Sequence, residues 1–376
     1  MNPRLRAVLD LMIPTAREEA GRHEYDGRIQ DLSIDGVQHS LDSISKPTDP
    51  SPLTDAHDDA HLVAFERGVQ IEFGDLAVHR SNPLVHLSNL ELTCYERDYA
   101  PADERSRSLQ SHLAAWPDAV DMAVESLDQV PAPVAHSLLD AVRGLAQSIP
   151  ENAPHAEQAT AAHRRFVQHV EHCAKTGSPD TAIGPGSLAS LMAGVNATEV
   201  DIAALATQAD AERTRLSKLL ETACKQLQPG VPVADVVASL MADHPNADGV
   251  IDEARDLTAE VIAFTEARGL VSHLDGECVV GLSPPSRRWA TAMLSWAAPG
   301  ERDTETRFDI TPPDDSWPVD EQREWLSMFN RTSMMAITVH EVAPGHFAHS
   351  RALRHTPGDV RRTLYSSAFV EGWAHY

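Results

Sequence analysis

The sequence of 376 residues predicts a mainly α fold with one small antiparallel β element. From about residue 61 to residue 270, apolar residues recur at spacings of three and four, the period of a helix with one buried face. Between residues 277 and 311, short apolar runs separated by Pro and Gly indicate strands instead. From Trp317 the helical pattern returns with an apolar stripe, which consists of Trp325, Leu326, Phe329, Met334 and Ile337.

The N-terminal residues 1–60 predict a short helix followed by a flexible linker, because residues 36–60 are rich in Ser, Asp and Pro. The helical scaffold that follows divides into segments with recognisable ends. Thr198 and Asp201 form a capping pair for the fourth helix, and Gly269 ends the fifth. The predicted helices cover residues 106–128, 133–148, 155–176, 198–227 and 247–268.

The strand candidates of the β element are separated by Pro-containing turns and cover residues 278–282, 289–296 and 307–310. One edge of such a sheet could bind an extended peptide by backbone hydrogen bonds. The alternative is a structural sheet that closes one wall of a cleft and has its edge covered by a neighbouring element.

The charge of the chain argues against several classes of partner. With 56 acidic and 31 basic residues, the formal net charge is −25. Nucleic acids and anionic membrane surfaces attract basic patches, so we expect neither as a partner. No apolar run is long enough to span a membrane, and Asp10 interrupts the apolar N-terminal patch that a signal peptide would need. We therefore expect a cytoplasmic protein.

The cysteines are scattered without paired spacing, which argues against a disulfide framework and against a cysteine-based zinc site. We expect four reduced, partly buried thiols at Cys94, Cys173, Cys224 and Cys278.

The most informative stretch is His-Glu-Val-Ala-Pro-Gly-His at residues 340–346, followed by Glu-Gly-Trp at residues 371–373. Two imidazoles and one carboxylate are typical ligands of a catalytic zinc ion, and a separate Glu can activate water. The same donor set also suits other divalent metals. We expect this site on two consecutive helices.

The spacing of the two histidines requires an interruption of the first helix. In a straight helix His346 would point about 240° away from His340, because each residue advances about 100°. Pro344 and Gly345 lie in this gap, and we interpret them as a bulge or break that returns His346 to the face of His340. The alternative is a helix that ends at Pro344, with His346 in a solvated loop.

The turn at residues 355–359 predicts a second helix that runs antiparallel to the first. With Pro357 as the centre of this hairpin, Glu371 lies level with residue 343, between the two histidines. Gly372 has no side chain and would let the two helices approach closely there. A carboxylate is therefore expected opposite the two imidazoles.

Glu341 directly follows His340, an expected metal ligand, but its side chain points in a different direction from the helix. Its expected role is that of general base, which takes a proton from the attacking water and passes it to the leaving amine; the alternative is a solvated glutamate. His375 lies four residues beyond Glu371 on the same helix face. It is either a surface histidine or a group that supports the ligands or contacts substrate. Weaker candidates for such a role are His349, which we interpret as a surface histidine, Trp373 and Tyr376.

The paired motifs resemble the domain-of-unknown-function 885 family of bacterial proteins, whose pattern is His-Glu-x-x-Pro-Gly-His followed by Glu-Gly-Trp-Ala. The resemblance is specific at residues 340–346 and 371–374 and extends back to about Gly184. The family is similar to the mostly helical zinc metallopeptidases with a long central cleft. This implies a metallopeptidase-like scaffold in which Glu341 is the base and the zinc ligands are His340, His346 and Glu371.

Members of this family continue past the Glu-Gly-Trp helix, whereas this chain stops at Tyr376 without a helix-ending signal. By that comparison the chain resembles a truncated member, and we expect little activity from it. We expect one continuous catalytic domain without its C-terminal part. Its regions are an N-terminal helix and linker over 1–60, a helical scaffold over 61–270, and a sheet with a metal-binding helix pair over 271–376.

The sequence therefore predicts a zinc-dependent hydrolase, specifically a peptidase that cleaves short peptides with metal-activated water. One alternative is an amidohydrolase that acts on a non-peptide amide, because the same ligands would serve either reaction. The other is a non-catalytic homologue that binds metal or peptide without turnover. The intact Glu341 favours catalysis. The sequence predicts no particular oligomeric state.

Overall fold

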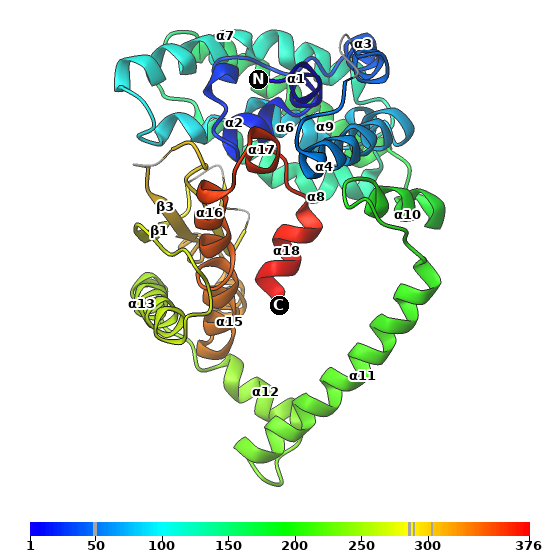
Figure 1. Ribbon diagram of the computed structural model, residues 1–376. Coiled ribbons are helices and arrows are strands. Elements are labelled where there is room, and N and C mark those ends of the chain that lie inside the picture. Colours follow the sequence, from blue (N-terminus) through cyan, green and yellow to red (C-terminus); the bar gives the residue numbers. More distant parts are fainter. Residues whose placement is uncertain (48–50, 285–286, 289, 302–303) are drawn as a thin grey trace.

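The computed structural model confirms the mainly α fold (Figure 1). The residues that it describes are 1–47, 51–284, 287–288, 290–301 and 304–376. The N-terminal half consists of packed helices, which are α1 (Pro3–Asp10), α2 (Ile13–Glu18), α3 (Ile34–Ser45), α4 (Ala56–Val69), α5 (Val78–Ser81), α6 (Pro83–Leu90), α7 (Ala102–Ser126), α8 (Ala132–Gly144), α9 (Ala156–Thr176) and α10 (Gly184–Gly194).

The long helix α11 (Ile202–Leu227) leaves this group as an arm, and α12 (Val233–Met241) and α13 (Val250–Arg268) lead back to a small sheet (Figure 1). The C-terminal helices then return toward the N-terminal group. They are α14 (Val319–Ser327), α15 (Arg331–Glu341), α16 (His346–His355), α17 (Asp359–Thr363) and α18 (Ser367–His375).

Within the described part of the chain, three hydrophobic clusters hold these elements together. One lies between α7, α8 and α9 and contains the fully buried Trp116 and Phe166. A second joins α1, α3 and α4 and includes Val360 and Leu364 from the C-terminal end of the chain. The third packs α13 and α15 on the sheet. Burial of such apolar surface is the main stabilising term in folding. The N-terminal helices therefore directly support the segment that follows the histidine motif.

The linker expected over residues 36–60 is wrong for most of its length. Helix α3 continues to Ser45, and α4 begins at Ala56. Asp55, one of the residues that suggested a linker, is the cap of α4 and accepts hydrogen bonds from its first backbone N–H groups. Ser33, before the expected linker, caps α3 in the same way. Residues 48–50 of the expected linker lie outside the described residues.

The five helices predicted between residues 106 and 268 are confirmed as α7, α8, α9, α11 and α13. Gly269 ends α13 in the left-handed conformation with φ +60°. The capping pair expected at the start of α11 is wrong in detail, because Asp201 itself is the cap. Its carboxylate accepts from the backbone N–H groups of Ala203 and Ala204, and Thr198 lies outside the helix.

The predicted strands are confirmed in position as β1 (Cys278–Leu282), β2 (Ala292–Ser295) and β3 (Thr306–Ile310); Trp289 lies outside the described residues. The expected antiparallel arrangement is wrong, because the sheet is mixed. Its order is β1-β3-β2, with β3 parallel to β1 and antiparallel to β2. After β1 the next strand, β2, takes the opposite edge of the sheet, and β3 then lies between β1 and β2. Two reversals of direction make β3 parallel to β1, and β2 is left at an edge.

A charge network joins the N-terminal helices to the loop between β2 and β3. His23 stacks on Tyr99 with ring centroids 3.6 Å apart. Its Nδ1 lies 3.3 Å from Asp26, and its Nε2 lies 3.0 Å from Glu301. Burial opposes a charged imidazole, but the two carboxylates outweigh it and raise the pKa of His23 to about 9.

The replacement His23→Gln should destabilise the fold in a pH-dependent way. The pKa is raised in the folded state above the ordinary value of about 6.5, so the stabilisation is fully present below about pH 6.5 and is lost as the pH rises through about 9. Thermal unfolding should give a lower Tm for the variant at about pH 6 and nearly equal Tm values at about pH 10. An equal deficit at both pH values would show that His23 acts only by packing on Tyr99.

The prediction of four buried thiols is confirmed, since all four cysteines are free and buried. Among the described helices, none combines the length and apolar character needed to cross a membrane.

Candidate metal centre

The helix that carries His340 is interrupted directly after the first part of the motif. Val342 leaves the helical conformation with φ −108° and ψ −85°, and α16 begins at His346. The Gly345 N–H donates a hydrogen bond back to α15 at 3.2 Å, so the break is tight. The break expected at Pro344 and Gly345 is confirmed, and His346 lies in the first turn of a new helix rather than in a solvated loop.

Glu371 arrives on α18, which is not continuous with the turn at residues 355–359. The single second helix that we expected is wrong, because α17 and α18 are separated by residues 364–366. Leu364 is buried against the N-terminal helices, and its carbonyl accepts a hydrogen bond from His61 Nε2 at 2.8 Å. This contact of Leu364 interrupts the expected helix between α17 and α18, so the predicted two-helix hairpin does not form. Glu371 nevertheless faces the two histidines.

Three helices thus bring His340, His346 and Glu371 together. His340 Nε2 lies 3.4 Å from Oε2 of Glu371, and His346 Nε2 lies 3.7 Å from Oε1. The centroids of the two imidazoles are 4.6 Å apart. Zinc–ligand distances of about 2.0–2.2 Å place tetrahedral ligand atoms about 3.3–3.6 Å apart. Each histidine is close to this spacing from one oxygen of Glu371, but the two distances run to different oxygens, so the side chains must rotate to share one metal ion.

The protonation of the histidines also fits metal binding. Burial lowers the pKa of both His340 and His346, and it outweighs the opposite effect of Glu371. A neutral imidazole offers a nitrogen lone pair to a metal without first releasing a proton. The site combines two neutral nitrogens with one carboxylate, which is a common zinc donor set.

Glu341 lies next to this cluster and is partly buried. Burial, with a smaller contribution from the charge of Glu371, raises the pKa of its carboxyl to about 7, while a hydrogen bond from the backbone of Leu294 opposes the shift. A bound dication nearby would lower this pKa, because positive charge favours the carboxylate. A group that titrates near neutral pH is well suited to accept and return a proton.

The profile of the bacterial protein family of unknown function DUF885 matches residues 14–376. This chain belongs to the DUF885 family. No curated protein matches it.

Two solved structures share the fold of this DUF885 chain. One is described as "a putative lipoprotein of unknown function" from Shewanella oneidensis, with 19% sequence identity and a TM-score of 0.66. The other is described as a "putative lipoprotein" from Colwellia psychrerythraea, with 12% identity and a TM-score of 0.65. In both comparisons the match covers 99% of this chain and 75% of the other. These similarities show the fold and nothing of the chemistry.

His375 of the DUF885 chain also reaches the cluster. Its ring centroid lies 4.7 Å from that of His340. One ligand atom each from His340, Glu371 and His375 lie within 4.8 Å of one another. His375 is exposed in the last turn of α18, whereas the side chain of His346 is only 10% exposed. The structure therefore offers His375 as a competitor to His346 for the third ligand position.

The interpretation of His349 as a surface histidine is wrong. It is buried, and its ring centroid lies 5.3 to 6.2 Å from those of Phe369, Trp296 and Tyr365. Burial lowers the pKa of His349 to about 4, so this ring is neutral at physiological pH. These partners come from α18, the segment before α18 and the residue that directly follows β2. The sequence pattern around His349 does not reveal these contacts.

The two remaining candidates differ in their contacts. Trp373 lies close to the motif, because its indole Nε1 donates a hydrogen bond to the Pro344 carbonyl at 2.8 Å. This bond fixes α18 against the break between α15 and α16. Tyr376 is fully exposed at the last residue. The structure thus assigns a positioning contact to Trp373 and none to Tyr376.

A cleft of about 990 Å³ opens beside the cluster. His346 and Glu371 line it together with Leu294 and Ser295 of β2 and Trp296 directly after this strand. Residues of α2 and α6 form other parts of its wall. This volume is at the upper end of the range for small-molecule sites, about 300–1,000 Å³. The cleft therefore has room for an extended substrate that reaches the candidate metal site.

Sequence reasoning missed two residues of this cleft. Tyr365 lines it, and its hydroxyl is buried without a hydrogen-bond partner in the described part of the chain. Glu19 also lines the cleft, and the protein atoms packed around its carboxyl, together with the charge of Glu18, raise its pKa to about 7. Neither residue belongs to a recognisable motif, and only the fold brings them near His346.

The replacement Gly345→Ala should abolish zinc binding at the site formed by His340, His346 and Glu371. A Cβ at this position would collide with the backbone carbonyl of His340, so the break must open and carry His346 away from Glu371. The matched control is Gly372→Ala, since a Cβ there meets nothing within 4 Å. That spacing also shows that the close helix approach expected at Gly372 is wrong. Zinc titration should therefore show loss in the first variant and unchanged affinity in the second; unchanged affinity in both would show that the break does not set the ligand geometry.

Proposed function

We propose that this DUF885 protein is a zinc-dependent hydrolase, specifically a peptidase that acts on short peptides. The observation that carries the proposal is the convergence of His340, His346 and Glu371 from three helices, with Glu341 beside them and a cleft in front of them. Catalytic zinc sites use three protein ligands and leave one position open for water or substrate.

A bound zinc ion would supply Lewis acidity, which lowers the pKa of water and polarises a carbonyl oxygen. The residues of the chain have distinct tasks around it. His340, His346 and Glu371 hold the ion at the mouth of the cleft. Glu341 accepts one proton from the attacking water while the water oxygen forms a bond to the carbonyl carbon. The same carboxyl returns the proton to the departing nitrogen as the carbon–nitrogen bond breaks.

The edge strand β2 supports a peptide as substrate. Because β3 occupies the centre of the sheet, β2 has one side without a strand partner among the described strands. Its residues Leu294 and Ser295 line the cleft, and so does Trp296, which directly follows the strand. An extended peptide can pair with such an edge through backbone hydrogen bonds. The contact between the backbone of Leu294 and Glu341 places this edge next to the proposed base.

The test is hydrolysis of a mixed library of short peptides by the zinc-loaded protein extended to the full length of the family domain. We expect cleavage that disappears after chelation and returns with zinc. A zinc-loaded protein that cleaves no peptide but hydrolyses non-peptide amides would be an amidohydrolase. A protein that binds zinc or peptides without any turnover would be the non-catalytic homologue considered above. Short peptides as partners and a cytoplasmic location also stay predictions.

A further inference from the structure

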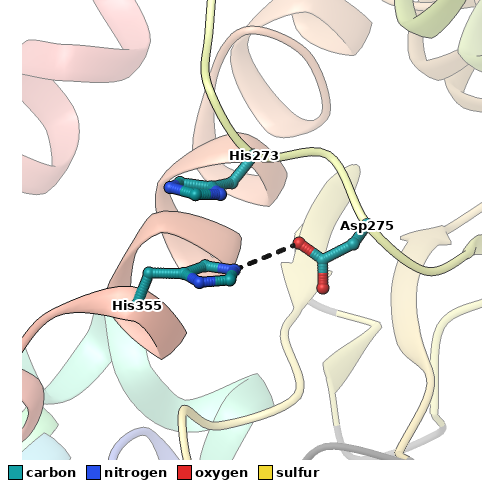
Figure 2. Close-up of side chains that lie close together, drawn as sticks. All are labelled: His273, Asp275 and His355. Atoms are coloured by element: carbon teal, nitrogen blue, oxygen red, sulfur yellow. Dashed lines mark ion pairs between the residues drawn. The ribbon is translucent and has the colours of Figure 1, made fainter.

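A second cluster of metal-binding side chains lies at the other end of α16. It consists of His355 in the last turn of the helix and of His273 and Asp275 in the segment between α13 and β1 (Figure 2). The imidazoles are stacked with centroids 3.8 Å apart and an interplanar angle of 11°. His355 Nε2 lies 3.5 Å from Oδ1 of Asp275. One ligand atom from each of the three residues lies within 4.8 Å of the others.

The segment that carries His273 and Asp275 is held against α16 by a separate buried contact. Arg351, one turn before His355, is buried and donates hydrogen bonds to the Glu277 carbonyl at 3.4 Å and to Thr306 Oγ1 at 3.0 Å. Gly276 has φ +87°, and a Cβ on it would lie 3.4 Å from Arg351 Nη2. The chain therefore turns tightly over the arginine, a conformation that glycine adopts readily. The convergence of the cluster follows from this fixed turn.

The donor set is specific enough to indicate the class of ion. Two imidazoles and one carboxylate suit zinc and its neighbours in the first transition series, whereas calcium and magnesium prefer oxygen ligands. The distance of 3.5 Å between His355 Nε2 and Asp275 Oδ1 matches the spacing of about 3.3–3.6 Å between tetrahedral zinc ligands. The second imidazole, that of His273, is only half-buried, so its side chain can rotate toward the ion and complete the set.

We propose that His273, Asp275 and His355 form a second, structural transition-metal site that binds zinc. The site fastens the segment before β1 to α16. His346 and His355 are nine positions apart on this helix, which corresponds to about 14 Å along its axis. The second ion thus clamps the far end of the helix that presents His346 to the cleft. This assignment does not depend on any catalytic activity.

The experiment uses the full chain, freed of metal by chelation and titrated with Zn²⁺ alone against a competing chelator. Wild type should bind two zinc ions, and each equivalent should raise the Tm, because a ligand that binds only the folded state stabilises it. The double variant His273→Gln/His355→Gln should bind one. Asp275→Asn should weaken the binding of the second zinc ion by at least about tenfold. His172→Gln, which changes an exposed histidine on α9, should still bind two.

The outcomes separate this proposal from the proposed function. Binding of a single zinc that is lost only in His340→Ala/His346→Ala would overturn the second site and leave an ion pair with a stacked histidine. A single zinc that is lost only in His273→Gln/His355→Gln would support the second site and contradict the catalytic one. Equal Tm values of the metal-free proteins show that a variant is folded, so a loss of binding reports the site itself.

Discussion

Glu341→Gln should lower peptide hydrolysis by about 10²–10⁴-fold while the zinc content stays that of the wild type. A general base must gain and lose a proton in each turnover, and glutamine has nearly the same shape but cannot do so. The carboxyl lies beside the metal cluster and has a pKa raised to about 7 by burial in metal-free protein. It is therefore the group in this site best suited to carry the proton from water to the leaving amine.

The measurement compares initial rates of peptide cleavage with zinc content determined on the same samples. A suitable control is Glu72→Gln, because Glu72 also has a pKa raised by burial but lies in the segment Gln70–Asp75, away from the motif. It should retain wild-type rates. If Glu341→Gln cleaves as fast as wild type, Glu341 is not the base. If zinc is lost along with activity, Glu341 supports the metal site and is not shown to transfer a proton.

Replacement of His340, His346 or Glu371 by Ala should each weaken zinc binding by at least about 100-fold, since even outer groups around a metal contribute about 10–100-fold. The physical reason is that a catalytic site has only three protein ligands. Loss of one leaves two donors and another position to be filled by water. Competition with a chromogenic chelator measures the effect for the first zinc site.

His375→Ala is the matched control for His346→Ala. Both imidazoles lie near His340 and Glu371, but His346 is buried at the start of α16, whereas His375 is exposed near the chain end. A buried, pre-positioned ligand loses less side-chain entropy on binding. We therefore expect the His375 variant to keep its zinc. The reverse result would move the third ligand from α16 to α18 and would contradict the ligand set proposed here.

The helical scaffold was predictable from the sequence because its signals are local. Apolar spacing located α7, α8, α9, α11 and α13, and Gly269 marked a helix end. The break at Pro344 and Gly345 was also local, since proline and glycine alter the backbone where they stand. These predictions needed no knowledge of distant contacts.

The sequence-based predictions were wrong where segments that are far apart in the sequence meet in the fold. Helices α17 and α18 are separate because Leu364 is buried among the N-terminal helices and bonded to His61. His349 is buried because α18 and Trp296, which directly follows β2, bring aromatic rings around it. The parallel pairing of β1 with β3 depends on the path of the connection before β2. None of these contacts leaves a pattern within a single helix or strand.

The most direct test is the position of zinc in crystals of the zinc-loaded protein, located by anomalous scattering at the zinc edge. We predict a peak about 2.0–2.2 Å from Nε2 of His340, Nε2 of His346 and a carboxylate oxygen of Glu371, with Glu341 nearby but not bound to the ion. Absence of a peak between α15, α16 and α18 under saturating zinc, or a peak ligated by Glu341, would contradict the proposed centre.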